Sequence, residues 1–161
     1  MSSQSETQVF LDLKMYLVGQ GWCVLGGQPP SGTDELPVIE IRDPLYRGRG
    51  SKGCYKPDLV AWSDYRLHII ELKPTYDSKD RSKVQKVLSS PERIDSLWES
   101  LIERKLKIAG LDDISSVRSR SVVVGGLGYG GTRVSHPDLW RFFVEDGQVE
   151  VTPGTFLVPS S

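Results

Sequence analysis

Two short apolar runs separated by a polar turn constrain the fold of this chain more than any other feature. Residues 58–62 and 67–72 are rich in β-prone side chains, and the four residues between them have the composition of a tight turn. We therefore predict an antiparallel β-hairpin. Centring the turn on residues 64 and 65 pairs Val60 with Ile69, which fixes the register of the whole hairpin.

This register brings charged residues together at the open end of the hairpin. It places Asp58 directly opposite Glu71, and side chains on a strand alternate between its two faces. Lys73 therefore lies on the same face as Glu71, while His68 points to the other face and is expected in the core. The sequence thus predicts two carboxylates and one ammonium group in one small region.

Two carboxylates in this position repel each other. At about 4 Å and an effective dielectric constant near 20, the repulsion is about 4 kcal/mol, which is a large part of a domain's stability. A divalent cation bound by both groups would remove the repulsion. Oxygen ligands without His or Cys favour Mg²⁺, with Mn²⁺ as a substitute, and the backbone carbonyl of Leu72 is a candidate for a further ligand.

Such a site has the chemistry needed for phosphodiester hydrolysis. A bound cation activates water, and Lys73 is placed to orient the nucleophile or to neutralise a phosphate. The alternative interpretation is that Asp58 and Glu71 are ordinary strand-end carboxylates and that Lys73 makes a surface salt bridge. Both runs are too apolar for an exposed ribbon, and Pro57 limits strand pairing just before Asp58, which favours a functional site.

The same residues match a known sequence signature. Pro57-Asp58 followed by Glu71-Leu72-Lys73 resembles the PD-(D/E)xK motif of restriction-endonuclease-like nucleases. That resemblance implies an α/β fold with an α-β-β-β-α-β core, a mixed central sheet flanked by helices, and a single nuclease domain over residues 1–161. It also implies a Mg²⁺-dependent DNA endonuclease with Asp58 and Glu71 as metal ligands and Lys73 as the catalytic lysine.

The resemblance suggests two further site residues. Many members of the family carry a glutamate on the first helix, which here would be Glu6, and some carry a glutamine after the lysine, which here would be Gln85. Each has a simpler interpretation, because an acid near a helix N-terminus is favourable and a glutamine is common on a solvated helix face. Both alternatives remain open at the level of the sequence.

The remaining elements are predicted from periodicity and from turn residues. We expect helices over 7–20, with Ser5 as N-cap and Gly21 as the stop, over 79–88, and from Pro91 toward Gly110. We expect strands over 22–25, 36–41, 121–124, 139–144 and 149–152. The glycine-rich run Gly125–Gly131 lacks the Lys-Ser/Thr ending of a phosphate-binding P-loop, and we expect it to be a mobile or DNA-contacting loop.

Basic residues flank the predicted site on both sides. Between Arg42 and Arg120 the chain has 17 Lys or Arg against 12 Asp or Glu, although its net charge is −1. Contacts from such side chains to phosphates would position DNA without reading its sequence, while ordinary solvation explains many surface charges equally well. The candidates for these contacts are Arg47, Arg49, Lys52, Lys56, Lys79, Arg81, Lys83 and Lys86, with Tyr46, Tyr55 and Tyr76 interleaved as stacking or packing residues.

Composition limits the broader class of the protein. With 161 residues, 38% apolar and 25% charged, the chain is typical of a globular domain, and it has neither a long apolar run nor a basic, apolar start. We therefore expect a cytoplasmic protein with Cys23 and Cys54 reduced. A chain this short is expected to cut two DNA strands as a homodimer or higher oligomer, or with a helicase or other partner.

The sequence leaves the biological role open. Restriction, homing, junction-resolving, repair and defence roles all fit a nuclease of this class. A non-catalytic nucleic-acid-binding module with the same fold is the main alternative, since fold does not fix function. A small protein-interaction domain that docks through its Gly/Arg loop is a further one.

Overall fold

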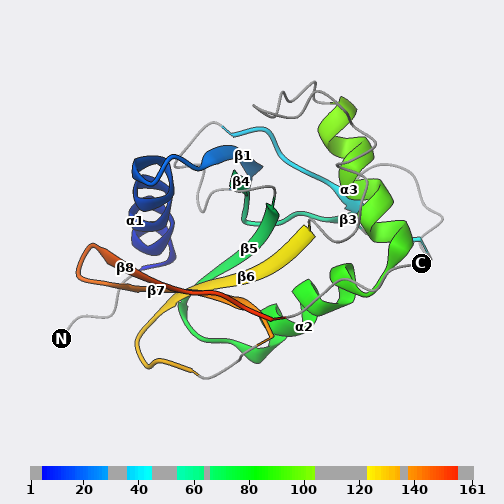
Figure 1. Ribbon diagram of the computed structural model, residues 1–161. Coiled ribbons are helices and arrows are strands. Elements are labelled where there is room, and N and C mark those ends of the chain that lie inside the picture. The colour runs from blue at the N-terminus through cyan, green and yellow to red at the C-terminus, as the bar shows by residue number, and fades with distance from the viewer. Residues whose placement is uncertain are drawn as a thin grey trace.

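The computed structural model describes residues 5–28, 36–44, 54–63, 66–103, 123–134 and 138–155. They form an α/β fold in which helices flank a mixed central sheet (Figure 1). In chain order the elements are α1 (Glu6–Gly19), β1 (Cys23–Gly27), β2 (Ile41–Arg42), β3 (Cys54–Tyr55), β4 (Leu59–Ser63), β5 (Arg66–Thr75), α2 (Ser78–Leu88), α3 (Pro91–Glu103), β6 (Val123–Gly130), β7 (Trp140–Glu145) and β8 (Gln148–Thr152).

The central sheet has six strands in the order β1-β4-β5-β6-β7-β8. The pairs β5–β6 and β6–β7 are parallel, and the other three pairs are antiparallel. Helices α2 and α3 lie in the connection between the parallel strands β5 and β6. Strands β2 and β3 form a separate two-stranded ribbon, which is tied to α3 where the Glu40 and Arg42 amides donate to the hydroxyls of Ser100 and Ser96.

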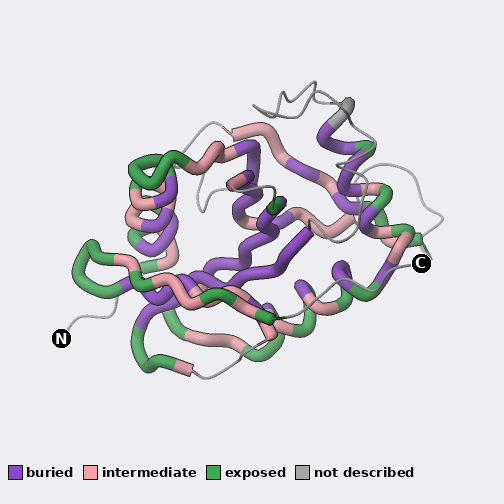
Figure 2. Tube along the Cα trace, in the orientation of Figure 1, coloured by how far each residue is buried: buried purple, intermediate pink, exposed green. Residues whose placement is uncertain are grey.

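Alternation along the strands divides the apolar side chains between two cores. Leu59, Ile70 and Leu72 pack on one face of the sheet against α1. Val60 and Ile69 pack on the other face against α2 and α3. As a result, β6 is buried from end to end, and β4 and β5 are buried except toward their ends (Figure 2). This is the two-faced hairpin that the sequence predicted.

The predicted helix starts are also found. The Ser5 hydroxyl accepts a hydrogen bond from the Gln8 amide at 3.1 Å, and the Ser90 hydroxyl accepts one from the Arg93 amide at 3.2 Å. Gly21, just beyond α1, has a φ of +85°, where a side chain would be strained. Each cap satisfies backbone groups that a helix end leaves without partners.

The prediction for Gly125–Gly131 is wrong, because residues up to Gly130 belong to the buried strand β6. This strand lies between β5 and β7 and is covered on both faces. A Cβ atom on Gly125 would collide with the Val84 side chain of α2, and one on Gly128 would collide with Leu72. The glycines therefore allow close packing in the centre of the sheet, a tertiary requirement that local propensity does not reveal.

Two other strand boundaries differ from the prediction. The strand expected over 36–41 is reduced to Ile41–Arg42 and belongs to the separate ribbon rather than to the central sheet. Strand β1 continues through two glycines to Gly27, which donates its amide to the carbonyl of Pro37 at 2.9 Å. The segment before β2 thus follows the end of β1 without forming a regular ladder.

His68 lies in the core, as its position on the strand predicted. It is packed among the rings of Trp22, Trp140 and Phe142 on the α1 face of the sheet. Burial, assisted by the charge of Arg66, lowers the pKa of His68 to about 3, so the imidazole is neutral near pH 7. It has the role of a packing residue.

Two findings bear on the expected environment of the protein. In the described ranges, no helix combines the length and the apolar character needed to cross a membrane. Cys23 and Cys54 are both free thiols and half-buried.

Candidate functional site

The β4–β5 hairpin has the register that the sequence predicted. Val60 pairs with Ile69 and Leu59 with Ile70, so Asp58, which directly precedes β4, lies one position beyond this ladder, level with Glu71. The Oδ2 atom of Asp58 accepts a hydrogen bond from the Leu72 amide at 2.8 Å. This bond fixes the half-buried Asp58 carboxyl at the open end of the hairpin.

The carboxyl groups of Asp58 and Glu71, called here the acid pair, are in contact. Glu71 is only 5% exposed. Burial is the largest cause that raises the pKa of Glu71 to about 9, followed by the hydrogen bond to Asp58 and by its negative charge. Without a cation, Glu71 is therefore protonated near neutral pH and can donate a hydrogen bond to Asp58, which removes the repulsion expected between two carboxylates.

Lys73 lies on the same side of the sheet and lines a small pocket with Glu71, Tyr76 and Asp80. Asp80 comes from the first turn of α2 and is only 3% exposed. Burial raises the pKa of Asp80, whereas the nearby charges of Lys73 and Lys83 lower it. The Nζ atom of Lys83 is 3.7 Å from an Asp80 oxygen. Helix α2 thus supplies a third acid beside the predicted lysine.

Sequence reasoning did not single out Asp80, because it stands in a helix whose visible feature is its basic charge. The available signal was its position seven residues after Lys73, at the start of the helix that follows β5. A helix that packs back on its own strand brings its first turn close to that strand's end.

Tyr55 is a second neighbour of the acid pair whose position the sequence did not reveal. It lies on β3, outside the central sheet, and its hydroxyl is buried. Burial, followed by the charge of Glu71, raises the pKa of Tyr55 well above its usual value. The hydroxyl is close enough to Glu71 to lower the pKa of that carboxyl, yet it has no hydrogen bond of good geometry within the described ranges.

Gln85 and Arg81 do not point to the acid pair. The Gln85 side-chain amide donates to Asp138 Oδ2 at 2.6 Å, and the Arg81 guanidinium donates to the same oxygen at 3.1 Å. Both side chains therefore connect α2 to Asp138, two residues before β7. The sequence had suggested Gln85 as an accessory site residue and Arg81 as a phosphate contact. In the structure both residues instead bind Asp138, Gln85 by a hydrogen bond and Arg81 by an ion pair.

The other basic residues of α2 are arranged differently. Lys79, Lys83 and Lys86, called here the lysine stripe, are exposed and follow an i, i+4, i+7 spacing, so they share one side of the helix. Lys56 is half-buried between β3 and β4. The predicted contacts at Arg47, Arg49 and Lys52 lie outside the described residues.

Glu6 is the first residue of α1. This helix packs on the sheet face that carries Leu72, whereas Glu71 and Lys73 belong to the face that carries Ile69. The helix that carries Glu6 therefore covers the opposite face of the sheet from the acid pair.

The acid pair offers oxygen atoms only, which suits a hard cation. In the part of the chain that the structure describes, no group of three or more His, Cys, Asp or Glu side chains is arranged to hold a metal ion. Mg²⁺ does not need such a group, because it commonly binds through one or two carboxylates and keeps water or substrate phosphates as its other ligands. The two carboxyl groups, with the Leu72 backbone beside them, therefore fit Mg²⁺ or Mn²⁺ and not zinc.

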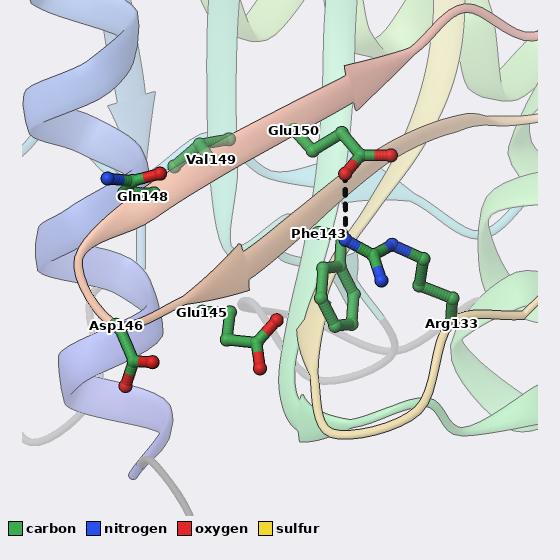
Figure 3. A pocket seen from close by; sticks show the side chains of 7 residues that line it. All are labelled: Arg133, Phe143, Glu145, Asp146, Gln148, Val149 and Glu150. Carbon is green, nitrogen blue, oxygen red and sulfur yellow. Dashed lines mark hydrogen bonds and ion pairs between the residues drawn. The ribbon is translucent and has the colours of Figure 1, made fainter.

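A second pocket lies along the β7–β8 hairpin and is lined by Arg133, Phe143, Glu145, Asp146, Gln148, Val149 and Glu150 (Figure 3). Arg133, the cationic residue among those that line this pocket, already interacts with Glu150 and Phe143. Arg133 is 2.8 Å from a Glu150 oxygen, and its guanidinium lies 4.5 Å from the centre of the Phe143 ring. This pocket does not repeat the arrangement of two buried carboxyl groups beside a lysine.

Comparison with protein-family models, with curated proteins and with solved structures found no match.

Replacing Asp58 with Asn tests whether the acid pair is under electrostatic stress in the metal-free protein. The pKa of Glu71 is raised on folding, so the folded state binds more protons and stability falls as the pH rises from about 4.5 toward 9. An Asn side chain removes the charge that causes part of this shift. Asp58→Asn should therefore stabilise the protein by about 1 kcal/mol at pH 8 in chelator, with a smaller gain at pH 5.

Urea unfolding at both pH values measures this difference. Glu99→Gln is the matched control, because it also neutralises an acid, but an exposed one on α3. If Asp58→Asn is less stable than the unaltered protein at both pH values, the Asp58 carboxylate is a structural group and not a strained one.

Proposed function

We propose that this chain is a Mg²⁺-dependent DNA endonuclease with a restriction-endonuclease-like core. The observation that carries the proposal is the contact of the buried Glu71 carboxyl with the half-buried Asp58 carboxyl, in a region that also contains Lys73. Burial and the contact with Asp58 raise the pKa of Glu71 to about 9, and carboxyls whose pKa is shifted by burial and by a specific partner are concentrated at functional sites. The PD-(D/E)xK pattern of these same residues agrees with the geometry.

Each residue of the site has a defined part in hydrolysis. Asp58 and Glu71 would hold the cation, together with the Leu72 carbonyl. When bound, the cation supplies charge neutralisation and activation of water. Lys73 neutralises a phosphate oxygen or orients the attacking water, and Asp80 provides an opposite charge near the Lys73 ammonium.

The lysine stripe supports a polyanionic substrate. Because an α-helix rises about 1.5 Å per residue, Lys79 and Lys86 are separated by about 10 Å along α2, a distance that covers more than one phosphate of a DNA strand. The first turn of this helix also supplies Asp80 to the pocket of Glu71 and Lys73. Phosphates bound along α2 would therefore continue toward the acid pair.

The most direct alternative is a non-catalytic nucleic-acid-binding module that keeps this fold. One observation favours it, since the described residues provide two carboxyls in contact and no larger metal-binding group. As a nuclease, the chain would act in restriction, homing, junction resolution or defence, as a homodimer or with a partner such as a helicase. A two-fold assembly would supply one site for each strand of a duplex.

Metal-dependent nicking of supercoiled plasmid tests the proposed activity. The unaltered protein should nick DNA with Mg²⁺ or Mn²⁺ and not with chelator. Asp58→Ala and Lys73→Met should each reduce the rate by at least about 100-fold, because one removes a ligand of the cation and the other a cationic group at the phosphate. Glu150→Gln, an exposed acid on another strand, should leave the rate unchanged.

Two outcomes would change the assignment. Nicking that continues at the normal rate in Asp58→Ala places the reaction elsewhere in the molecule. If the unaltered protein binds DNA but cleaves neither duplex, branched nor single-stranded DNA, the non-catalytic alternative replaces the nuclease.

Neutralising the lysine stripe should weaken DNA binding in a salt-dependent way. Each lysine that neutralises a phosphate adds about 0.9 to the slope of log K against log salt, so replacing Lys79, Lys83 and Lys86 with Gln should make the slope shallower by about 2.7. Fluorescence anisotropy with labelled duplex DNA at several salt concentrations measures the slope. Lys14→Gln, on α1, is the control, and an unchanged slope in the triple variant would exclude this side of α2 from the interface.

A further inference from the structure

The Tyr55 hydroxyl is a buried polar group that the proposed chemistry has not used. Its oxygen is inaccessible to solvent and has no well-formed hydrogen bond within the described ranges. Burial of an unpaired hydroxyl is unfavourable, and a phenylalanine would fill the same space without this penalty. The hydroxyl therefore indicates a partner that the described residues of the metal-free protein do not provide.

The surroundings of the hydroxyl are acidic. Of the charged neighbours, Glu71 raises the pKa of Tyr55 most, and the charges of Asp58 and Asp80 raise it further. A buried tyrosine O–H with an acidic neighbour can act as a hydrogen-bond donor to its carboxyl group. The Tyr55 hydroxyl interacts with the Glu71 carboxyl closely enough to lower the pKa of Glu71. The two groups do not have the geometry of a well-formed hydrogen bond.

The backbone that carries Tyr55 is held from outside the central sheet. Tyr55 pairs with Ile41 in the β2–β3 ribbon. The ribbon is anchored to α3, since the Arg42 amide donates to the Ser96 hydroxyl at 2.8 Å. The ring of Tyr55 also packs against the α2–α3 core. The hydroxyl is thus held beside Glu71 by an element that is independent of the hairpin.

We propose that Tyr55 is a positioning residue that donates a hydrogen bond to the Glu71 carboxylate and orients it for binding a divalent cation together with Asp58. This inference rests on the cation site of the proposed function and extends it to a residue outside the PD-(D/E)xK pattern. Carboxylates that bind metals are themselves hydrogen-bonded by neighbouring groups. Removal of such a neighbour typically weakens metal affinity or activity by about 10–100-fold.

A packing role and a positioning role make different demands on Tyr55. Packing against the α2–α3 core needs only the aromatic ring, which Phe retains. Orientation of Glu71 needs the O–H group, which Phe lacks. The substitution Tyr55→Phe therefore distinguishes the two roles, because it removes only the hydroxyl group and keeps the ring.

Binding of Mn²⁺ to the full chain, measured by calorimetry and by the electron paramagnetic resonance spectrum of the bound ion, tests the inference. Tyr55→Phe should weaken Mn²⁺ binding by about 10–100-fold. Its melting temperature in chelator should equal or exceed that of the unaltered protein, because the unpaired buried hydroxyl is gone. Tyr16→Phe, a half-buried tyrosine of α1 on the other face of the sheet, is the matched control and should bind Mn²⁺ normally.

The outcomes separate this inference from the proposed function. A Tyr55→Phe variant with Mn²⁺ affinity within twofold of the unaltered protein, or with a clearly lower melting temperature in chelator, overturns the positioning role. If the unaltered protein binds Mn²⁺ but does not cleave DNA, and Tyr55→Phe weakens Mn²⁺ binding, the nuclease proposal is wrong and the positioning role of Tyr55 is supported. Failure of the unaltered protein to bind Mn²⁺ overturns both proposals.

Discussion

The contact between the Asp58 and Glu71 carboxyls determines how the rest of the site is organised. The hairpin register places the two groups together, and the Leu72 amide holds one of them by a hydrogen bond. Because Glu71 is buried, the contact needs either a shared proton or a cation to be stable. The positions of Lys73, Asp80 and Tyr55 around this pair then have a common electrostatic explanation.

Helix α2 serves two different purposes on two of its sides. One side contacts Asp138 through Arg81 and Gln85 and so fixes the helix against the segment that leads into β7. Another side exposes the lysine stripe to solvent. Neighbouring basic residues of α2 therefore divide into one that fixes the helix, Arg81, and a solvent-exposed group, the lysine stripe, and only the packing of the helix distinguishes them.

The sequence predicted the hairpin and its register correctly, because a two-residue period and a short turn act locally. It failed for β6, because glycines in a central strand are dictated by helices packed on both faces, as Val84 shows at Gly125. It also failed to place Asp80 and Tyr55 at the site, because α2 and the β2–β3 ribbon reach the acid pair through tertiary packing. Local sequence patterns were thus sufficient to predict the acid pair of the candidate site, whereas its neighbours Asp80 and Tyr55 could be identified only from the fold.

The most direct test is the titration of Glu71 itself. The ¹³C resonance of its side-chain carboxyl, assigned by its absence in Glu71→Gln, should titrate in chelator with a midpoint near pH 9. Saturating Mg²⁺ should shift this midpoint to a much lower pH, because a cation favours the ionised form. A midpoint near the ordinary value of 4.5 in chelator, unchanged by Mg²⁺, would contradict a buried acid pair that binds a cation.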